Sequence, residues 1–180
     1  MSEYLPILVI GAIGFGFAAS TVGSWLVAPS SALDVKAVSS IFETKNRPSF
    51  DPLILHVGSL EQVKPFVSSF PEKLKRLAEA FWPGPLTVLL PRNASVPDLV
   101  TSGLDRVAVR VPNHPLTLAL LAQLDFPLAA PSANPFGYIS PTQAAHVAAQ
   151  LGPQIPYILD GGVCAVGLES TIVGMEGEQV

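Results

Sequence analysis

The sequence predicts one α/β domain that spans residues 1–180. From residue 30 onward, segments with helical periodicity alternate with short apolar segments typical of strands. No internal repeat and no low-complexity linker separates these segments, so the pattern predicts a single unit. With 49% hydrophobic and 13% charged residues, the 180-residue chain is apolar enough to bury a substantial core, which excludes a disordered protein.

The first thirty residues carry almost no charge, and no charged side chain occurs between Tyr4 and Pro29. This run is close to the length of a membrane-spanning helix. Four glycines and Pro6 interrupt it, and no Lys or Arg precedes it. Short buried strands joined by glycine turns therefore explain it best. A membrane anchor and an altered N-terminal segment are the alternatives.

The first part of the domain holds two predicted helices and three predicted strands. Ser31 and Asp34 resemble a helix N-cap, and apolar residues then recur at helical spacing up to Lys45. Pro48 disfavours helical geometry at Arg47, so the chain turns there into a strand. A second amphipathic helix ends at a Trp-Pro-Gly-Pro turn. The predicted elements are a helix at 33–45, a strand at 52–57, a helix at 74–81, and strands at 86–90 and 107–111.

The second part continues the alternation. An apolar helix precedes a short strand, which runs into a proline-flanked turn at 131–135. Ser140, Pro141 and Gln143 have the pattern of an N-cap, a first-turn proline and a capping-box glutamine, which predicts a helix directly after them. The predicted elements are a helix at 115–124, a strand at 126–130, a helix at 142–151, and strands at 157–159 and 170–173.

Charge and cysteine content limit the classes of function. The net charge of −4 gives no general attraction to nucleic acid. The single cysteine, Cys164, cannot form an internal disulfide, which fits a reducing compartment and predicts a cytoplasmic protein. No basic residue lies near Cys164 in sequence, so it is expected to be a buried packing residue. The sequence contains no metal-ligand cluster, no Walker A loop and no Gly-x-Ser-x-Gly elbow.

Two polar segments are candidates for binding an anion. Lys45 and Arg47 follow the first helix, where they either bind an anionic ligand or only favour the negative end of the helix dipole. Ser132 and Asn134, between prolines, either form a simple turn or line a ligand loop. Ser140 is explained as an N-cap, although the helix N-terminus it would cap is also suited to a phosphate. Spacing alone does not decide between these interpretations.

Two residues in apolar strands are candidates for a substrate site. Arg110 shares its strand face with Ala108, and a charge there needs a partner, which is either a buried acid or a substrate carboxylate. His56 lies at the end of its strand and is either a core histidine or a site residue.

Six segments, in order between Lys45 and Val173, resemble the YrdC-like threonylcarbamoyl-AMP synthases. They are Lys45–His56, Phe81–Thr87, Val109–His114, Ala130–Asn134, Ser140–Thr142 and Gly167–Val173. The resemblance implies a twisted, mixed open sheet with flanking helices around a basic cavity. It also implies an enzyme that joins L-threonine, bicarbonate and ATP into threonylcarbamoyl-AMP and releases pyrophosphate, with Mg²⁺ neutralising that leaving group. The product would then serve the tRNA-modification machinery, and no stable membrane association is expected.

The resemblance also assigns roles to individual residues. Lys45 and Arg47 are expected to be catalytic and to meet the ATP phosphates, and Asp51 stands where a polar nucleotide contact is usual. The remaining assignments are Ser132, Asn134 and Ser140 on the nucleotide side, and Thr21, His56, Arg110 and Ser170 on the threonine side.

The sequence departs from the family pattern at both ends. The family carries a Pro-Thr-Glu-Thr-Val-Tyr-Gly-Leu-like segment before its first helix, where this chain has Ala19-Ser-Thr-Val-Gly-Ser-Trp-Leu26, with Thr21 as a remnant. The family's Arg-Pro-Gly segment after the last strand is not found. The chain is therefore expected to be truncated at its C-terminus and to be the catalytic domain of a longer, two-domain member. A relative that binds RNA or nucleotide without catalysis, and a membrane-tethered inactive relative, are the alternative functions.

Overall fold

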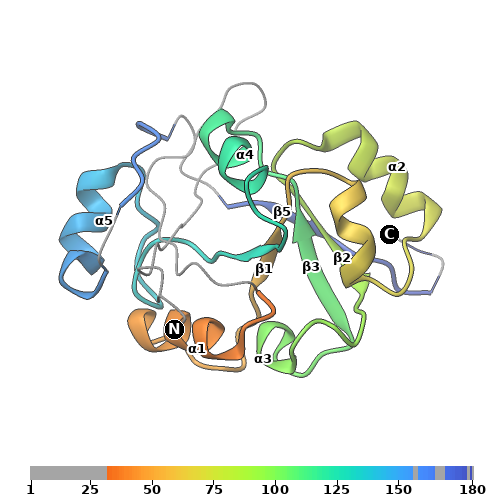
Figure 1. Cartoon of the computed structure of the whole chain (residues 1–180), viewed down its shortest axis with the longest axis horizontal. Helices are drawn as coiled ribbons and strands as arrows, with labels where there is room; N and C mark the ends of the chain where they lie inside the picture. The colour runs from red at the N-terminus through yellow and green to blue at the C-terminus, as the bar shows by residue number, and fades with distance from the viewer. Residues whose placement is uncertain (1–31, 156–157, 165–168, 178, 180) are drawn as a thin grey trace.

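The computed structural model describes residues 32–155, 158–164, 169–177 and 179, and it has a mixed sheet with helices around it (Figure 1). The helical elements are α1 (Val35–Lys45), η1 (Glu61–Phe66), α2 (Glu72–Phe81), α3 (Asp98–Thr101), α4 (Pro115–Leu121), α5 (Ala144–Leu151) and η2 (Gly152–Gln154). The strands are β1 (Ile54–His56), β2 (Leu86–Pro91), β3 (Arg106–Arg110), β4 (Leu128–Ala129) and β5 (Thr171–Val173).

The five strands lie in the order β4-β1-β3-β2-β5. The pairs β1–β3 and β2–β5 are parallel, whereas β1–β4 and β2–β3 are antiparallel, so the sheet is mixed. The register of the central pair sets His56 opposite Arg110 and Ile54 opposite Ala108. On the other side of β3, Leu89 pairs with Ala108.

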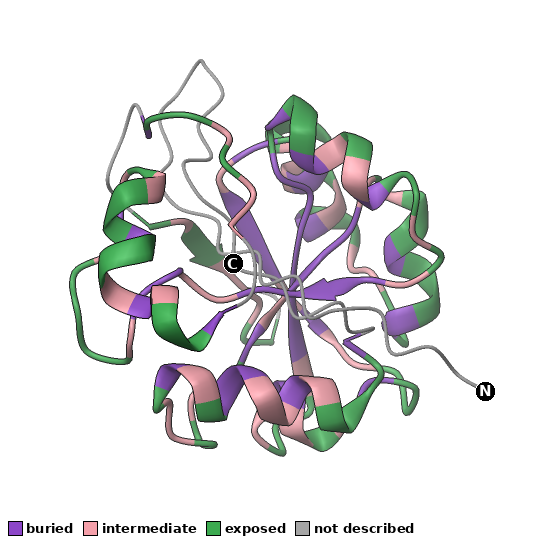
Figure 2. Ribbon diagram, turned by 60° about the vertical axis from the view of Figure 1, so that its left-hand side comes forward, coloured by how far each residue is buried: buried purple, intermediate pink, exposed green. Residues whose placement is uncertain are grey.

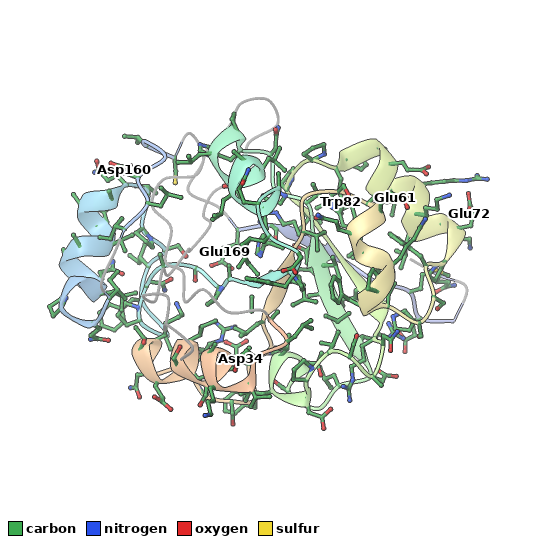
Figure 3. All side chains as sticks on the ribbon, in the orientation of Figure 1. Asp34, Glu61, Glu72, Trp82, Asp160 and Glu169 are labelled. Carbon is green, nitrogen blue, oxygen red and sulfur yellow. The ribbon has the colours of Figure 1, made fainter. Side chains whose placement is uncertain are left out.

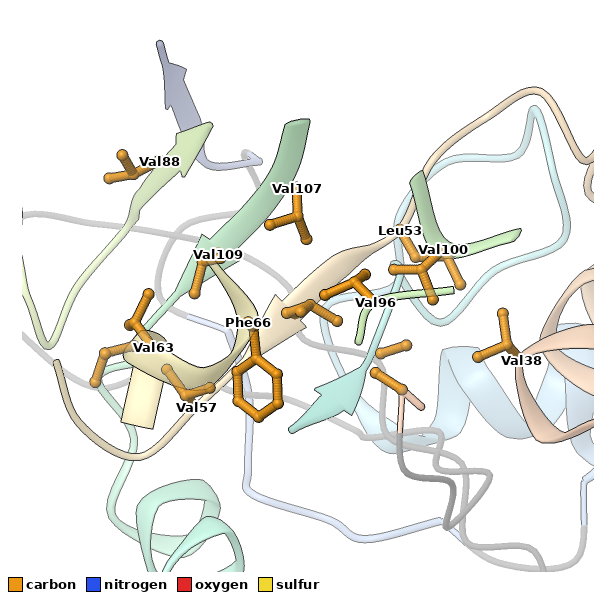
Figure 4. Close-up of a cluster of buried hydrophobic side chains, with 14 of the residues drawn as sticks. Val38, Leu53, Val57, Val63, Phe66, Val88, Val96, Val100, Val107 and Val109 are labelled. Carbon is orange, nitrogen blue, oxygen red and sulfur yellow. The ribbon is translucent and has the colours of Figure 1, made fainter. Parts of the chain in front are cut away.

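The two faces of the sheet have different surroundings. One face carries Leu55, Val88 and Val109, which belong to the main hydrophobic cluster together with residues of η1. Figure 4 shows Val63 and Phe66 of η1 beside this face. Buried residues gather on the central strands, and exposed residues lie on the outer sides of the helices (Figure 2). The apolar side chains on this face of the central strands therefore belong to the main core, whereas the opposite face carries polar side chains.

The opposite face carries the polar residues of the three central strands. Alternation along each strand places Ile54 and His56 on this face, together with Ala108 and Arg110 of β3. The β2–β3 register places Leu89 on this face, and alternation along β2 places every second residue from Leu89 there too. His56 and Arg110 are 2% and 3% exposed, so the strands bury a histidine and an arginine side by side.

Helix α1 carries the first candidate site residues at its C-terminal end. Asp34 is its N-cap, and the carboxylate accepts hydrogen bonds from Lys36 N (2.9 Å) and Ala37 N (3.4 Å). The helix ends at Lys45, and Asn46 adopts the left-handed conformation that closes many helices. The cap and the turn at Pro48 therefore fix where Lys45 and Arg47 leave the helix.

Most of the predicted elements are confirmed, with bounds that differ by up to three residues. The predicted helices at 33–45, 74–81 and 115–124 correspond to α1, α2 and α4, and five of the six predicted strands are present. In the predicted strand 157–159, residue 157 lies outside the described residues and Leu159 makes only an isolated bridge, so a strand over 158–159 is wrong. The elements α3 and η1 were not predicted. Cys164 is buried, as expected of a packing residue.

The capping role predicted for Ser140 is wrong. Helix α5 begins at Ala144, its N-cap position is Gln143, and none of the described side chains caps it. The Ser140 hydroxyl donates instead to Glu169 Oε1 at 3.0 Å. A contact 29 residues away in sequence has therefore taken the hydroxyl that the local pattern assigned to the helix.

The expectations for residues 4–29, including the buried strands and the anchor, fall outside the described residues. Among the residues that are described, no helix is both long and apolar enough to span a membrane.

Candidate functional site

A cavity of about 500 Å³ lies on the polar face of the sheet. Ile54, Leu89 and Ala108 form its floor, and the end of α1 and the loop 131–138 form its walls. Its charged lining residues are Lys45, Arg47, Asp51 and Glu169. The volume lies within the range of cavities that hold small-molecule ligands.

Lys45 ties the end of α1 to the Ser132–Asn134 loop. The side chain is 1% exposed, and its Nζ donates hydrogen bonds to the carbonyl oxygens of Ser132 and Asn134. Burial and the neighbouring Arg47 lower the pKa of Lys45 to about 7. An ammonium has three N–H donors, so two are engaged by the loop and a third is left for a ligand in the cavity.

Arg47 lies at the cavity wall in an ion pair. Its Nη2 is 3.0 Å from Asp51 Oδ1, and its guanidinium also donates to Asp51 O (3.1 Å) and Pro52 O (2.9 Å). Partial burial lowers the pKa of Arg47, and Asp51 opposes that shift. These contacts hold the guanidinium in one orientation, so its charge is positioned before any ligand binds.

The loop after β4 is held to α1 at several points. Besides the two bonds from Lys45, Phe136 N donates to Lys45 O at 2.9 Å. Asn134 Nδ2 donates to the carbonyl oxygens of Pro135 (3.0 Å) and Tyr138 (2.6 Å). Asn134 is 6% exposed, and its Oδ1 makes no hydrogen bond to the residues that the structure describes. The loop is therefore a fixed cavity wall.

Glu169 joins the same cavity from the segment before β5. It lies near the middle of the molecule in Figure 3, whereas Glu61 and Glu72 lie toward the edge. Its charge opposes the lowering of the pKa of Lys45 and of Arg47, and its carboxylate accepts the hydrogen bond from Ser140. Glu169 was not predicted as a site residue, although it lies within the Gly167–Val173 segment that carries the resemblance.

His56 and Arg110 form a second polar group on the same sheet face, next to the cavity floor. Burial, with the Arg110 charge as the second cause, lowers the pKa of His56 to about 3, so its imidazole is neutral at physiological pH. Burial also holds the pKa of Arg110 well below its usual value. Arg110 Nε donates to Gly84 O at 3.1 Å.

Ser170 adjoins this group through the paired strands β2 and β5. Thr87 Oγ1 donates to Ser170 Oγ at 2.9 Å, and Thr87 is fully buried. Thr87 was not predicted, although it ends the Phe81–Thr87 segment of the resemblance.

The predicted residues therefore fall into two adjoining groups. The first lines the cavity and consists of Lys45, Arg47, Asp51, Ser132 and Asn134, with Ser140 attached through Glu169. The second consists of His56, Arg110 and Ser170, which do not line the cavity. Thr21 lies outside the described residues.

The chain belongs to the Sua5/YciO/YrdC family, whose sequence profile, described as "Telomere recombination", matches residues 17–180. Its relatives include the threonylcarbamoyl-AMP synthases of Pyrococcus abyssi and Bacillus subtilis. The chain is 47% identical to the first over 146 residues (81% of this chain and 43% of the relative). It is 46% identical to the second over 145 residues (80% and 42%). The chain thus spans less than half the length of these relatives.

Solved structures agree with this assignment. The structure of P. abyssi Sua5 complexed with L-threonine has a TM-score of 0.80 and 42% identity, covering 94% of this chain and 46% of that one. E. coli YciO, at 19% identity, has a TM-score of 0.76 over 94% of this chain and 78% of that one, and shares the fold.

Proposed function

We propose that this chain forms threonylcarbamoyl-AMP, joining L-threonine, bicarbonate and ATP and releasing pyrophosphate. The observation that carries the proposal is the placement of two groups on one sheet face, a cavity with two cations and a buried arginine beside its floor. Two cations suit a polyphosphate, and a guanidinium suits a carboxylate. Relatives named threonylcarbamoyl-AMP synthase, and a relative solved with L-threonine, support it.

Arg110 is assigned to the threonine carboxylate. The planar guanidinium matches a carboxylate with two parallel hydrogen bonds, and burial at 3% exposure strengthens that contact by excluding water. His56, which is neutral, and Ser170 are assigned to the polar groups of threonine as hydrogen-bonding partners. Thr21 is assigned to the same substrate from the family resemblance alone.

The reaction has two bond-forming steps. The threonine amine attacks bicarbonate carbon and, with loss of water, gives a carbamate. A carbamate oxygen then attacks the α-phosphorus of ATP, a P–O bond forms, and the bond to pyrophosphate breaks. Charge grows on phosphate oxygens in this second step, so Lys45 and Arg47 contribute by positioning and electrostatic stabilisation. No side chain is needed as a covalent nucleophile.

Magnesium fits this cavity as an ion carried largely by the nucleotide. Asp51 and Glu169 offer carboxylate oxygens at the cavity, and no cluster of three or more acidic, histidine or cysteine residues occurs among the described residues. Mg²⁺ is commonly held by one or two carboxylates together with substrate phosphates. The ion would neutralise the leaving pyrophosphate.

The compartment and the next step follow from the same proposal. A lone, buried Cys164 is compatible with a reducing cytoplasm. The mixed anhydride product is an activated acyl donor, so the reaction that consumes it is an acyl transfer by the tRNA-modification machinery.

Replacement of Arg110 by lysine tests the threonine site. Arg110→Lys keeps the positive charge but lacks the two parallel N–H donors of the guanidinium. The threonine KM should therefore rise roughly 10- to 100-fold, the effect of losing hydrogen bonds to a charged group. The ATP KM should stay unchanged. Pyrophosphate release is measured against threonine and against ATP. Arg106→Lys is the control, because Arg106 lies on the same strand and donates to Met175 O. An unchanged threonine KM in Arg110→Lys would contradict the assignment.

A further inference from the structure

We propose that Phe136 and Tyr138 form the nucleobase end of the cavity and stack against the base of ATP. The inference rests on the proposed function, and it adds the residues that bind the part of the nucleotide remote from the reacting phosphate.

The cavity lining combines charged and aromatic side chains. Lys45, Arg47 and the two carboxylates lie in its lining together with apolar and aromatic side chains. Phe136 and Tyr138 are 45% and 66% exposed, and both belong to the lining. An aromatic ring left in solvent at the edge of a charged cavity suits a ligand with one anionic part and one flat apolar part. A nucleoside triphosphate has both.

The backbone on either side of Gly137 is held to residues of the cavity wall. Phe136 N donates to Lys45 O at 2.9 Å, and Tyr138 O accepts from Asn134 Nδ2 at 2.6 Å. Between them Gly137 has φ +79°, a left-handed conformation that glycine adopts without strain. The backbone of the aromatic loop is therefore anchored to Lys45, which is assigned to the phosphates, and to Asn134, which is assigned to the nucleotide side. A base and a triphosphate of one molecule could be held at the same time.

Stacking makes the contribution insensitive to base identity. Every base presents a flat π face to an aromatic ring, so stacking adds affinity without discriminating between bases. The loop should therefore strengthen binding of ATP and GTP alike and add nothing to binding of a polyphosphate that lacks a base.

Equilibrium binding of two ligands to the full chain tests this proposal. ATP and inorganic tripolyphosphate are titrated by calorimetry into the unchanged protein, Phe136→Ala, Tyr138→Ala and Phe136→Trp. Each alanine variant should bind ATP roughly 5- to 100-fold more weakly, the range for loss of one base-stacking contact, and tripolyphosphate equally well. Phe136→Trp should retain ATP binding. Phe81→Ala is the matched control, since Phe81 is 41% exposed on α2 and outside the cavity lining.

The outcomes separate this inference from the proposed function. An unchanged protein that binds neither ligand overturns both. An alanine variant that binds ATP normally, or that loses both ligands equally, overturns the stacking role alone, because the loop then contributes nothing to the base or serves only to support Lys45.

Discussion

The buried amine of Lys45 binds the Ser132–Asn134 loop, and its protonation depends on the charge of a ligand in the cavity. The residue is 1% exposed and donates to two loop carbonyls, and its pKa is lowered to about 7. The amine is therefore only about half protonated at neutral pH, whereas the ordinary lysine value is 10.5. A phosphate in the cavity favours the ammonium form and raises that pKa again.

ATP binding is therefore expected to take up a proton at Lys45 above pH 7. Since the free pKa is about 7 and the bound pKa is higher, ATP affinity should fall as the pH rises from 7 toward 9. Calorimetry at pH 8 in buffers of different ionisation heat measures the uptake. Lys45→Met should abolish it, while Lys36→Met, an exposed residue of α1, should not. Equal uptake in the protein and in Lys45→Met would contradict the assignment.

Arg47 is expected to contribute to the chemical step. Its guanidinium is positioned at the cavity by Asp51, so Arg47→Ala should lower adenylate formation by at least ~10²-fold, the scale for loss of one oxyanion donor. Threonine-dependent exchange between ATP and pyrophosphate measures this step.

One control variant and one conservative variant accompany Arg47→Ala. Arg76→Ala removes an exposed arginine on α2 and should be silent. Arg47→Lys retains the charge and reports on the carbonyl contacts. Near-normal exchange in a folded Arg47→Ala protein would rule out the phosphate role.

Among the elements, α1 matters because it delivers Lys45 and Arg47 to the cavity. Its N-cap is Asp34, whose carboxylate accepts from two backbone N–H groups. The strand pair β1–β3 plays the equivalent part for the second group, because its register sets His56 opposite Arg110.

Loss of the α1 cap should destabilise the fold without touching the cavity. Asp34→Ala should lower the free energy of unfolding by about 1 kcal/mol, the usual cost of an N-cap, whereas Asp34→Asn should cost little because asparagine caps equally well. Urea unfolding with both variants measures this difference. Equal stability of the alanine and asparagine variants would show that the cap contributes nothing.

Local sequence patterns explain the elements that were predicted and those that were not. The helix over α1 and the strands β2 and β3 have periodicity within themselves and were predicted. The four-residue α3 and the 3₁₀ helix η1 are too short for a periodic signal, so they were missed. Ser140 matched a capping pattern, but its hydroxyl binds Glu169, and a single local window cannot contain that contact.

For the whole molecule, the site depends on pairings between distant segments. The order β4-β1-β3-β2-β5 places residues from both halves of the chain around one cavity. The sequence supplied Lys45 and Ser132 as candidates, but their spacing alone also fitted a helix-end charge and a simple turn. The ordered resemblance favoured a shared site, and the bond from Lys45 to Ser132 O places them together. The role of Glu169 depends on the same long-range folding.

We propose that this chain, which spans less than half the length of its synthase relatives, catalyses the adenylation. The most direct measurement incubates the protein with ATP, Mg²⁺, L-threonine and bicarbonate and detects the product by mass. We expect threonylcarbamoyl-AMP and an equal amount of pyrophosphate to form, both only when threonine is present. Binding of ATP and threonine with no threonylcarbamoyl-AMP formed would contradict it and identify a relative that binds these substrates without joining them.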